Sequence, residues 1–381
     1  MLLDDSRSRD RQQVSPRVLW LSPWVRLAAR IQAEALRRRG ADVLLVTSDD
    51  HWESDAARDY ELVLDPRWQR AATWPPTLAS WYRIRQYRPD VVITEMVLDP
   101  RWIALAGRAP RIQLVHDDRP HDPVEELSLH LRTIFDRWGA RSAATIIYSD
   151  YVADAVATRR DVIGTRRYVV PLCGDLDSAL VPPFVAPEGR RDFVMVGRLN
   201  PYKNVDVVLQ AWHRHVTGGA WRGDNLVFIG DGPVMDRSLP EHTMWRPGRY
   251  RYVDIVSTVA AAKGSIAHYR RATQSGVQVM SMQLGVMPMV STAGALPEFQ
   301  PPGGPAIGVD DVSGLAAAFD YLADPSTAAR CGAAAARHYA QRFAVEHTAD
   351  RMMDVIADVL AARSPGRSTI VPAGRAGSGL P

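Results

Sequence analysis

Lysine is almost absent from this chain. Of its 46 lysine and arginine residues only two, Lys203 and Lys263, are lysines. Each of them is therefore a place to ask what a compact ammonium group does that a planar guanidinium cannot. Cysteine is as scarce. Cys173 and Cys331 are too few for a disulfide framework, so a reducing cytoplasm is the expected compartment.

Apolar runs long enough to cross a membrane are missing as well. Residues 1–16 are polar and rich in Asp and Arg, where a signal peptide would need an apolar stretch. The net charge is only +3, and 43 acidic residues interleave with the basic ones, so no nucleic-acid partner is expected. What is present is a globular composition, with 46% hydrophobic residues and a length of 381 residues that suits two domains.

Short apolar segments alternate with stretches of helical spacing along most of the chain. The strands expected in the first half are Arg17–Leu21, Asp42–Thr47, Asp90–Thr94, Arg111–Val115, Ala144–Tyr148 and Tyr168–Pro171. Those expected in the second half are Asp192–Val196, Asn225–Ile229, Tyr250–Val256 and Met287–Ser291, before a helix-rich end. This alternation predicts an α/β fold of two doubly wound, Rossmann-like domains, with a ligand in the cleft between them.

The most informative motif follows the first strand of the second half and runs from Gly197 to Lys203. Arg198 stands at the carboxyl end of the strand, and Lys203 stands near the start of the next helix. Two cations across a strand–loop–helix junction, with free backbone amides nearby, suit a pyrophosphate. The alternative is a solvated loop with two ordinary surface cations.

Two further strand ends carry turns that suit a ligand. Gly230-Asp231-Gly232 follows the second of these strands, and its glycines permit positive φ and a close approach of the ligand to the backbone. Ser275 is placed to cap a helix just after two arginines, which predicts a second anion site. The alternative for this third element is a buried crossover helix with no ligand.

Three segments, in this order, resemble the nucleotide-sugar half of glycosyltransferase family 4: Val-Gly-Arg-Leu-Asn-Pro-Tyr-Lys-Asn, Ile-Gly-Asp-Gly-Pro and Gly-Ala-Leu-Pro-Glu. The likeness covers about residues 192–350 and is looser in the first half. It implies the GT-B fold and a retaining enzyme that takes a sugar from a nucleotide-diphosphate donor. No cofactor or metal is implied, and the adjacent Asp117 and Asp118 do not suggest a metal site because neighbouring side chains point apart in a strand.

The resemblance also implies residue roles. Arg198 and Lys203 would hold the donor diphosphate and stabilise the charge that builds on the leaving phosphate, whose oxygen would itself take the acceptor's proton. His116 matches the family's cleft histidine and completes the implied catalytic set, a strand-end histidine without a catalytic role being the alternative. The implied donor contacts are Gly197, Arg198, Lys203, Gly230, Asp231, Gln274, Ser275, Gly276, Val277 and Glu298.

The same likeness and the composition along the chain divide the protein into parts. We expect an acceptor-binding domain at 1–180, with 1–16 disordered, and a nucleotide-sugar-binding domain at 188–344. A Pro-rich hinge at 181–187 separates the two domains. A helix at 345–363 would cross back to the first domain, and a disordered tail would follow at 364–381.

The sequence departs from the family in its carboxylates. The family carries two glutamates eight positions apart, which touch the donor sugar and the ribose, but this chain has no glutamate between Glu241 and Glu298. Ala272 and Met280 occupy the two positions, so Gln274, Ser275 or Gln278 would have to substitute. The paired glycines of the first loop are replaced by Trp24-Val25-Arg26, where Arg26 is a candidate replacement charge. These losses keep open a catalytically silent GT-B protein that acts as a partner of another enzyme, although the intact Arg198 and Lys203 favour an enzyme.

The acceptor is expected on the first domain. Eight of the 11 tryptophans lie in the first half, where they suit stacking on an acceptor as well as core packing. The bias toward Arg and Ala is typical of a GC-rich bacterium, so natural products, glycolipids and polysaccharides are the expected acceptor classes. Arg37–Arg39 is interpreted as a solvated face, with peripheral contact to anionic lipid as the alternative. Lys263 has no assigned role and is expected at the surface.

Overall fold

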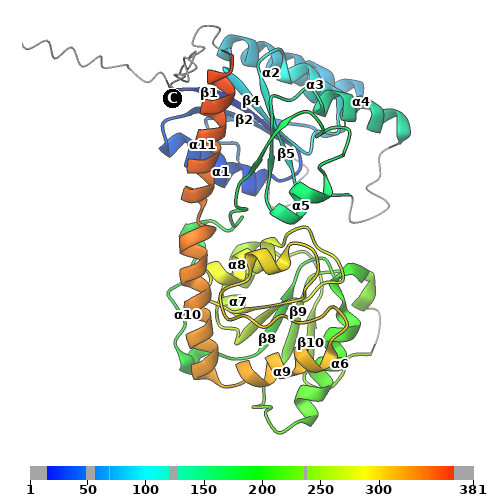
Figure 1. The fold of residues 1–381 in the computed structure, drawn as a ribbon, viewed down its shortest axis with the longest axis vertical. Coiled ribbons are helices and arrows are strands. Elements are labelled where there is room, and N and C mark those ends of the chain that lie inside the picture. The colour runs from blue at the N-terminus through cyan, green and yellow to red at the C-terminus, as the bar shows by residue number, and fades with distance from the viewer. Residues whose placement is uncertain (1–14, 49–55, 68, 120–127, 236–237, 364–381) are drawn as a thin grey trace, which may run out of the picture.

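Two parallel β-sheets, one in each half of the chain, form the framework of the protein (Figure 1). The computed structural model describes residues 15–48, 56–67, 69–119, 128–235 and 238–363. The first sheet has the order β3-β2-β1-β4-β5-β6-β7 and the second the order β10-β9-β8-β11-β12. The predicted architecture of two doubly wound α/β domains is thereby confirmed.

The strands are short, and every pairing within the two sheets is parallel. The first sheet consists of β1 (Arg17–Ser22), β2 (Asp42–Ser48), β3 (Glu61–Leu64), β4 (Val91–Glu95), β5 (Arg111–Val115), β6 (Ala144–Ile147) and β7 (Arg166–Val169). The second consists of β8 (Phe193–Val196), β9 (Leu226–Ile229), β10 (Thr243–Arg246), β11 (Gly264–Ala267) and β12 (Pro288–Val290).

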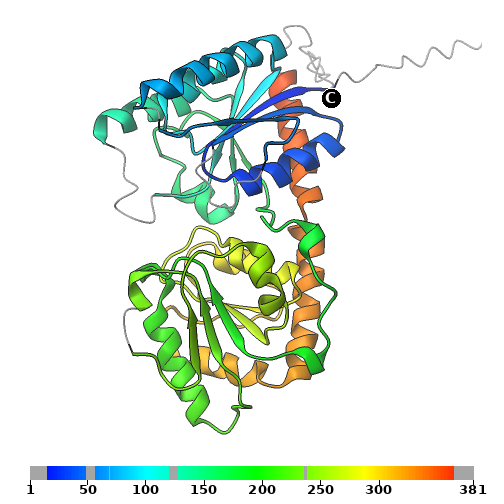
Figure 2. The ribbon, with the colours of Figure 1, turned by 180° about the vertical axis from the view of Figure 1, so that it is seen from behind.

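Helices connect the strands and cover both faces of each sheet (Figures 1 and 2). The first domain contains α1 (Arg26–Arg38), α2 (Trp74–Tyr87), α3 (Pro100–Ala106), α4 (Leu129–Gly139) and α5 (Asp150–Ala155). The rest of the chain contributes α6 (Val205–Thr217), α7 (Tyr252–Ala260), α8 (Gly276–Gln283), α9 (Val312–Leu322), α10 (Pro325–Arg342) and α11 (Val345–Ala361).

Successive strand residues point to opposite sides of the first sheet, and apolar clusters cover both of its faces. In β1, Val18 and Trp20 belong to one apolar cluster with residues of α1 and α11, whereas Leu19 and Leu21 belong to another with residues of α2 and α3. The second sheet is covered in the same way, by α6 and α9 on one face and by α7 and α8 on the other. Because both faces of each sheet are covered, a ligand site is expected beyond the carboxyl ends of the strands.

Helices α10 and α11 follow one another along one side of the molecule, α10 beside the second domain and α11 beside the first (Figures 1 and 2). Met352 of α11 lies in the buried cluster of the first domain. Arg38 pairs with Glu346 at 3.3 Å, and Arg39 with Asp350 at 2.6 Å. The side chains of Arg38 and Arg39 are 52% and 29% exposed, so the end of α1 is a surface face whose arginines also pair with acidic side chains of α11.

One expected strand is a helix. Residues 250–256 are rich in aromatic and β-branched side chains, which favour a strand. However, α7 begins there, at Tyr252, because Asp254 accepts hydrogen bonds from the Arg251 backbone and side chain and starts the helix. The strand of this region is β10, at the sheet edge, where Met244 and Trp245 are exposed. Two further strands, β3 and β11, were not predicted, since each is only four residues long and β11 contains Gly264 and Ser265.

Lys263, expected at the surface, is 3% exposed. Its Nζ atom lies 2.6 Å from a carboxylate oxygen of Asp224 and donates to the carbonyl of Ala323 at 2.7 Å. Lys263 is buried because it directly precedes β11, an unpredicted strand in the interior of the second sheet. The expected disordered ends fall almost wholly on residues outside the described ranges. No helix within those ranges is long and apolar enough to cross a bilayer.

Candidate active site

Two adjoining cavities, of about 680 and 290 Å³, lie where the domains face each other. Both are lined by Asp175, Gly197, Arg198, Tyr250 and Tyr252. The larger cavity lies between the start of α1, at residues 24–28, and the turns at 230–232 and 248–250. The smaller extends to Lys203, Tyr269 and the start of α8. Arg198 is exposed at the junction, where a long anionic ligand would reach both spaces.

Lys203 forms a buried wall of the smaller cavity and is 4% exposed. Its Nζ atom donates to the carbonyl of Val196 at 3.2 Å and to the hydroxyl of Tyr269 at 2.9 Å. It also lies 4.2 Å from the centre of the Tyr269 ring. No carboxylate of the described residues lies within ion-pair distance of this ammonium. Burial lowers the pKa of Lys203, and the positive charge of Arg198 lowers it further.

The glycines of the first two motifs make room for this arrangement. Gly197 has φ of +113°, and a Cβ atom there would lie 3.0 Å from Lys203 Nζ. A Cβ atom on Gly230 would lie 2.3 Å from the carbonyl oxygen of Gly197, because the two turns pack backbone against backbone. Asp231 accepts a hydrogen bond from the backbone of Gly248 at 2.5 Å. Its carboxylate therefore holds the 248–250 turn, which lines the larger cavity.

The start of α8 forms another wall of the smaller cavity. Ser275 caps the helix, as predicted, because its Oγ accepts from the Gln278 backbone at 3.2 Å. The hydroxyl of Tyr269 lies 3.2 Å from the same Oγ and so links Lys203 to the cap. Gly276 and Val277 line the cavity, and a helix start carries free backbone N–H groups that attract an anion.

His116 follows β5 and lies beside Glu95, the last residue of the neighbouring strand β4. Its Nε2 atom is 2.7 Å from Glu95 Oε1, and Glu95 Oε2 accepts from Ser22 at 2.7 Å and Trp20 at 3.2 Å. Burial alone lowers the pKa of His116, but the hydrogen bond and charge of Glu95 outweigh it and raise the pKa above its ordinary value. The other ring nitrogen, Nδ1, lies 3.4 Å from the side-chain amide of Gln274 in the opposite domain.

Two family profiles cover most of this chain. The profile described as Glycosyltransferase Family 4 matches residues 28–178, and that described as Glycosyl transferases group 1 matches residues 190–324. The chain is a family 4 glycosyltransferase. No curated protein sequence matches it.

Solved structures share the fold of this glycosyltransferase at low identity. Sucrose-phosphate synthase from Thermosynechococcus elongatus is 15% identical with a TM-score of 0.68, over 91% of this chain and 100% of that one. HepE from Anabaena, in complex with UDP and glucose, is 14% identical with a TM-score of 0.62, over 90% and 100%. WaaG, involved in lipopolysaccharide biosynthesis, is 15% identical with a TM-score of 0.58, over 89% and 99%. These likenesses confirm the GT-B fold.

The two domains of the glycosyltransferase touch directly beside the histidine. Asp117 accepts a hydrogen bond from the hydroxyl of Thr273, and Asp118 pairs with Arg271 at 3.3 Å. With the contact between His116 and Gln274, three consecutive residues of the first domain meet the loop before α8. Within the described ranges no group of three or more His, Cys, Asp or Glu side chains is placed to hold a metal ion.

Glu298, a predicted donor contact, lines neither cavity. Its carboxylate instead accepts hydrogen bonds from the backbones of Asp150 and Tyr151, at 2.8 and 2.7 Å. These two residues start α5 in the first domain, so Glu298 forms a second tie between the domains. The other predicted donor contacts lie on or beside the two cavities.

The positions of the family glutamates are apolar, and of the two only Ala272 borders a cavity, the smaller one. Ala272 and Met280 are 3% and 1% exposed. Of the expected replacements, Gln274 and Ser275 line the smaller cavity, whereas Gln278 is buried and donates to the carbonyl of Leu296 at 3.0 Å. Gln278 lines neither cavity, and its amide nitrogen is used within the second domain.

Arg26, the candidate replacement charge of the first loop, does not face the cavity. It is 2% exposed and its Nε lies 2.8 Å from Glu61, which also pairs with Arg30. These two arginines lower the pKa of Glu61 to about 2 against the raising effect of burial. Trp24 of the same loop is 44% exposed and lines the larger cavity, while Trp20 and Trp102 are core residues.

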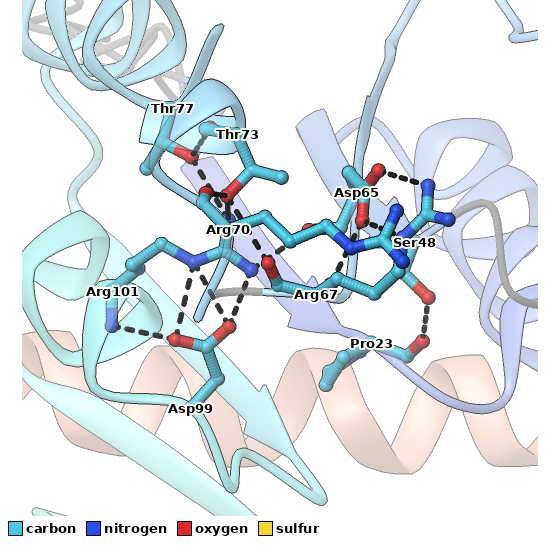
Figure 3. Close-up of polar contacts among 9 residues, drawn as sticks. All are labelled: Pro23, Ser48, Asp65, Arg67, Arg70, Thr73, Thr77, Asp99 and Arg101. Atoms are coloured by element: carbon cyan, nitrogen blue, oxygen red, sulfur yellow. Dashed lines mark hydrogen bonds and ion pairs between the residues drawn. The ribbon is translucent and has the colours of Figure 1, made fainter. Parts of the chain in front are cut away.

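A buried arginine connects the loops that follow β3 and β4 at the carboxyl end of the first sheet (Figure 3). Arg101 is 2% exposed, and its guanidinium donates to Asp99 at 2.6 Å, to Thr73 at 2.9 Å and to the carbonyl of Asp65 at 2.7 Å. The contacts join α3 to the residues before α2 and after β3. Because its donors are used within the protein, Arg101 is a structural residue rather than a ligand contact.

Glu95, Tyr269 and Arg101 are polar residues of the cleft region that the sequence did not single out. Glu95 had a weak signal, a carboxylate at the end of an otherwise apolar strand next to the strand that precedes His116. Tyr269 had none, because its role depends on β11, which the sequence pattern did not predict. Their positions follow from strand order, which a sequence pattern does not contain.

Proposed function

We propose that this glycosyltransferase moves a sugar from a nucleotide-diphosphate donor to an acceptor hydroxyl, with retention of configuration at the anomeric carbon. The observation that carries the proposal is the buried ammonium of Lys203, which lacks a carboxylate partner among the described residues and faces a cavity beside Arg198. An uncompensated buried charge is unfavourable, so such a site suits an anionic ligand. Two structures of similar fold, HepE and a trehalose-6-phosphate protein from E. coli, are complexes with UDP or a UDP-sugar.

The donor diphosphate would lie between Arg198, Lys203 and the start of α8. As the bond between the sugar and the phosphate breaks, negative charge grows on the leaving diphosphate. Fixed cations and helix N–H groups stabilise that charge more than they stabilise the bound donor, which accelerates the step. The leaving phosphate oxygen takes the proton of the acceptor hydroxyl, so the mechanism needs no protein base.

His116 would bind a hydroxyl of the transferred sugar. Glu95 occupies its Nε2 atom, so Nδ1 is the nitrogen that faces Gln274, a residue that lines the smaller cavity. Its present contact with Gln274, at 3.4 Å, is long enough to be exchanged for a donor hydroxyl. The raised pKa of His116 also favours an imidazolium form, whose charge would assist departure of the diphosphate.

The acceptor would enter from the first domain, along the start of α1. Trp24 and Leu27 give this wall of the larger cavity an apolar and aromatic surface, which suits stacking on a sugar ring or an apolar acceptor. Natural products, glycolipids and polysaccharides remain the acceptor classes that we propose. Contact with an anionic membrane surface is less favoured, because Arg38 and Arg39 are paired with α11.

The experiment is a titration of the protein with UDP, GDP, ADP and their sugar derivatives, followed by thermal unfolding and calorimetry. We expect one nucleoside diphosphate to raise the unfolding temperature and the effect to vanish in Arg198→Ala and Lys203→Met. No shift with any nucleotide would contradict the proposal. Binding without hydrolysis or transfer of any donor would favour the catalytically silent alternative, for which the apolar Ala272 and Met280 are the structural argument.

A further inference from the structure

A carboxylate stands in the donor cleft although α8 carries none. Asp175 belongs to the segment that joins the two sheets, and it lines both cavities. The hydroxyl of Tyr252, at the start of α7, donates to its Oδ2 atom at 2.5 Å. The side chain is thus held by a neighbour and faces the space assigned to the donor.

The joining segment brings this carboxylate onto the first turn of α8. A Cβ atom built on Gly276 would lie 3.9 and 4.0 Å from the two carboxylate oxygens of Asp175. The close approach depends on Gly174, where a Cβ atom would lie only 2.6 Å from the side-chain oxygen of Gln283. Gln283 in turn donates to the carbonyl of Leu176 at 3.1 Å, which fixes the segment against the helix.

The direction of Asp175 matters because residues four apart share one face of a helix. Gly276 and Met280 are such a pair, so the Asp175 carboxylate lies over the helix face that carries Met280. Met280 occupies the position of a family glutamate and has no carboxylate of its own. A carboxylate this close to a bound diphosphate repels it, so another favourable contact with the ligand must compensate the repulsion. Accepting hydrogen bonds from two adjacent hydroxyl groups is the use that suits a carboxylate in a nucleotide site.

We propose that Asp175 binds a vicinal diol of the donor, either that of the ribose or that of the transferred sugar, and that Tyr252 positions it. This inference rests on the proposed function, since it needs a nucleotide-sugar in the cleft. In this chain the joining segment thereby supplies the carboxylate that α8 lacks. Asp175 is then a specificity residue that discriminates donors by their hydroxyl groups.

The test measures two affinity ratios by calorimetry in the wild type, Asp175→Asn and Asp175→Ala. The first is UDP, GDP or ADP against its 2′-deoxy form, and the second is a nucleotide-sugar against its nucleoside diphosphate. If the ribose is bound, the wild type prefers the ribonucleotide and both variants lose about tenfold of that preference. If the sugar is bound, the second ratio falls instead by a similar factor.

Asp177→Asn is the matched control, because Asp177 is an exposed carboxylate of the same segment that caps residues 178–180. It should leave both ratios unchanged. Tyr252→Phe is the second variant, should Asp175 variants fail to fold, and we expect a smaller loss in the same ratio.

Unchanged affinity ratios in the Asp175 variants and in Tyr252→Phe would overturn the inference. This holds even if the variants bind the nucleoside diphosphate more tightly because a negative charge has been removed. In that case the proposed function still stands if Arg198→Ala and Lys203→Met abolish binding. Absence of nucleotide binding in the wild type would overturn both.

Discussion

The two lysines of this chain are equally buried and opposite in their surroundings. Lys263 is 3% exposed and has a carboxylate, Asp224, at 2.6 Å. Lys203 is 4% exposed, and among the described residues its only hydrogen-bond partners are a carbonyl and a tyrosine hydroxyl, beside an aromatic ring. The protein thus neutralises one ammonium group itself, whereas the other faces a cavity.

The difference separates a structural charge from a functional one. A buried ion pair contributes little net stability but is costly to break, because the remaining charge is stranded. A buried cation without a counter-charge is costly from the start, and its retention suggests that a ligand completes it. Burial therefore does not distinguish the two lysines. The presence of a carboxylate beside Lys263, and not beside Lys203 among the described residues, distinguishes them.

The largest effect is expected when the neutralised lysine is changed. Lys263→Met leaves Asp224 buried without its partner, which should cost about 3–5 kcal/mol of the free energy of unfolding. Chemical denaturation measures this loss. The double variant Lys263→Met, Asp224→Leu should regain most of it. If the single variant were about as stable as the wild type, the distinction between a structural Lys263 and a functional Lys203 would be contradicted.

Lys203→Met should show the reverse pattern. Activity should fall about 100- to 1000-fold in kcat/KM, as when one preorganised donor to a developing anion is removed. Stability should not fall, because burial lowers the pKa of Lys203 and the lost charge was unfavourable in the free protein. Steady-state kinetics and a melting curve on one preparation check both halves, and a drop in melting temperature comparable to that of Lys263→Met would contradict the account.

The third prediction concerns the pair formed by His116 and Glu95 on the first domain, in which the carboxylate of Glu95 neutralises the imidazolium. Glu95→Gln should reduce kcat/KM about 10- to 100-fold, as when carboxylates that orient other site histidines are removed. Because His116 has a raised pKa in the folded protein, its contribution to stability is full below the unfolded pKa of about 6.5 and is lost as pH rises through the folded value.

In Glu95→Gln that pH-dependent contribution should vanish, so the stability difference from the wild type should be largest at low pH. NMR titration of the imidazole should give a lower pKa in the variant. An unchanged His116 pKa would contradict the assignment of Glu95 as its positioning residue.

The smallest effect is expected at the ties between the domains. Glu298→Ala removes the acceptor of two backbone N–H groups of α5. We expect a more open average shape in small-angle scattering and a change of only a few fold in KM, since Asp117 and Asp118 still meet Thr273 and Arg271. A loss of activity as large as that of Lys203→Met would assign Glu298 to the donor site after all.

The sequence predicted well what depends on local pattern. The apolar runs gave nine of the strands because both faces of a parallel sheet are buried. Gly197, Lys203 and Ser275 were recognised because a strand end, a turn and a helix cap have local signatures. The helix α7 was mistaken for a strand because residues 250–256 are rich in aromatic and β-branched side chains, and so short a segment does not separate the two periods.

What the sequence did not predict depends on contacts between distant segments. Asp224 and Lys263 meet because β11 is inserted beside β8, and Glu95 meets His116 because β4 and β5 are neighbours. Arg26 was assigned to the cleft from its place in the first loop, but Glu61 of β3 draws it inward. Strand order decides each of these pairs.

The scarcity of lysine provides the most direct test of the central claim. Labelling with 13C-ε-lysine gives two side-chain resonances, and Lys263→Met assigns them. We predict that the Lys203 resonance titrates with a pKa below the ordinary value of about 10.4 in the free protein, and that the bound nucleoside diphosphate raises this pKa while the Lys263 resonance stays in place. A Lys203 resonance that titrates normally and does not respond to a bound diphosphate would contradict the account.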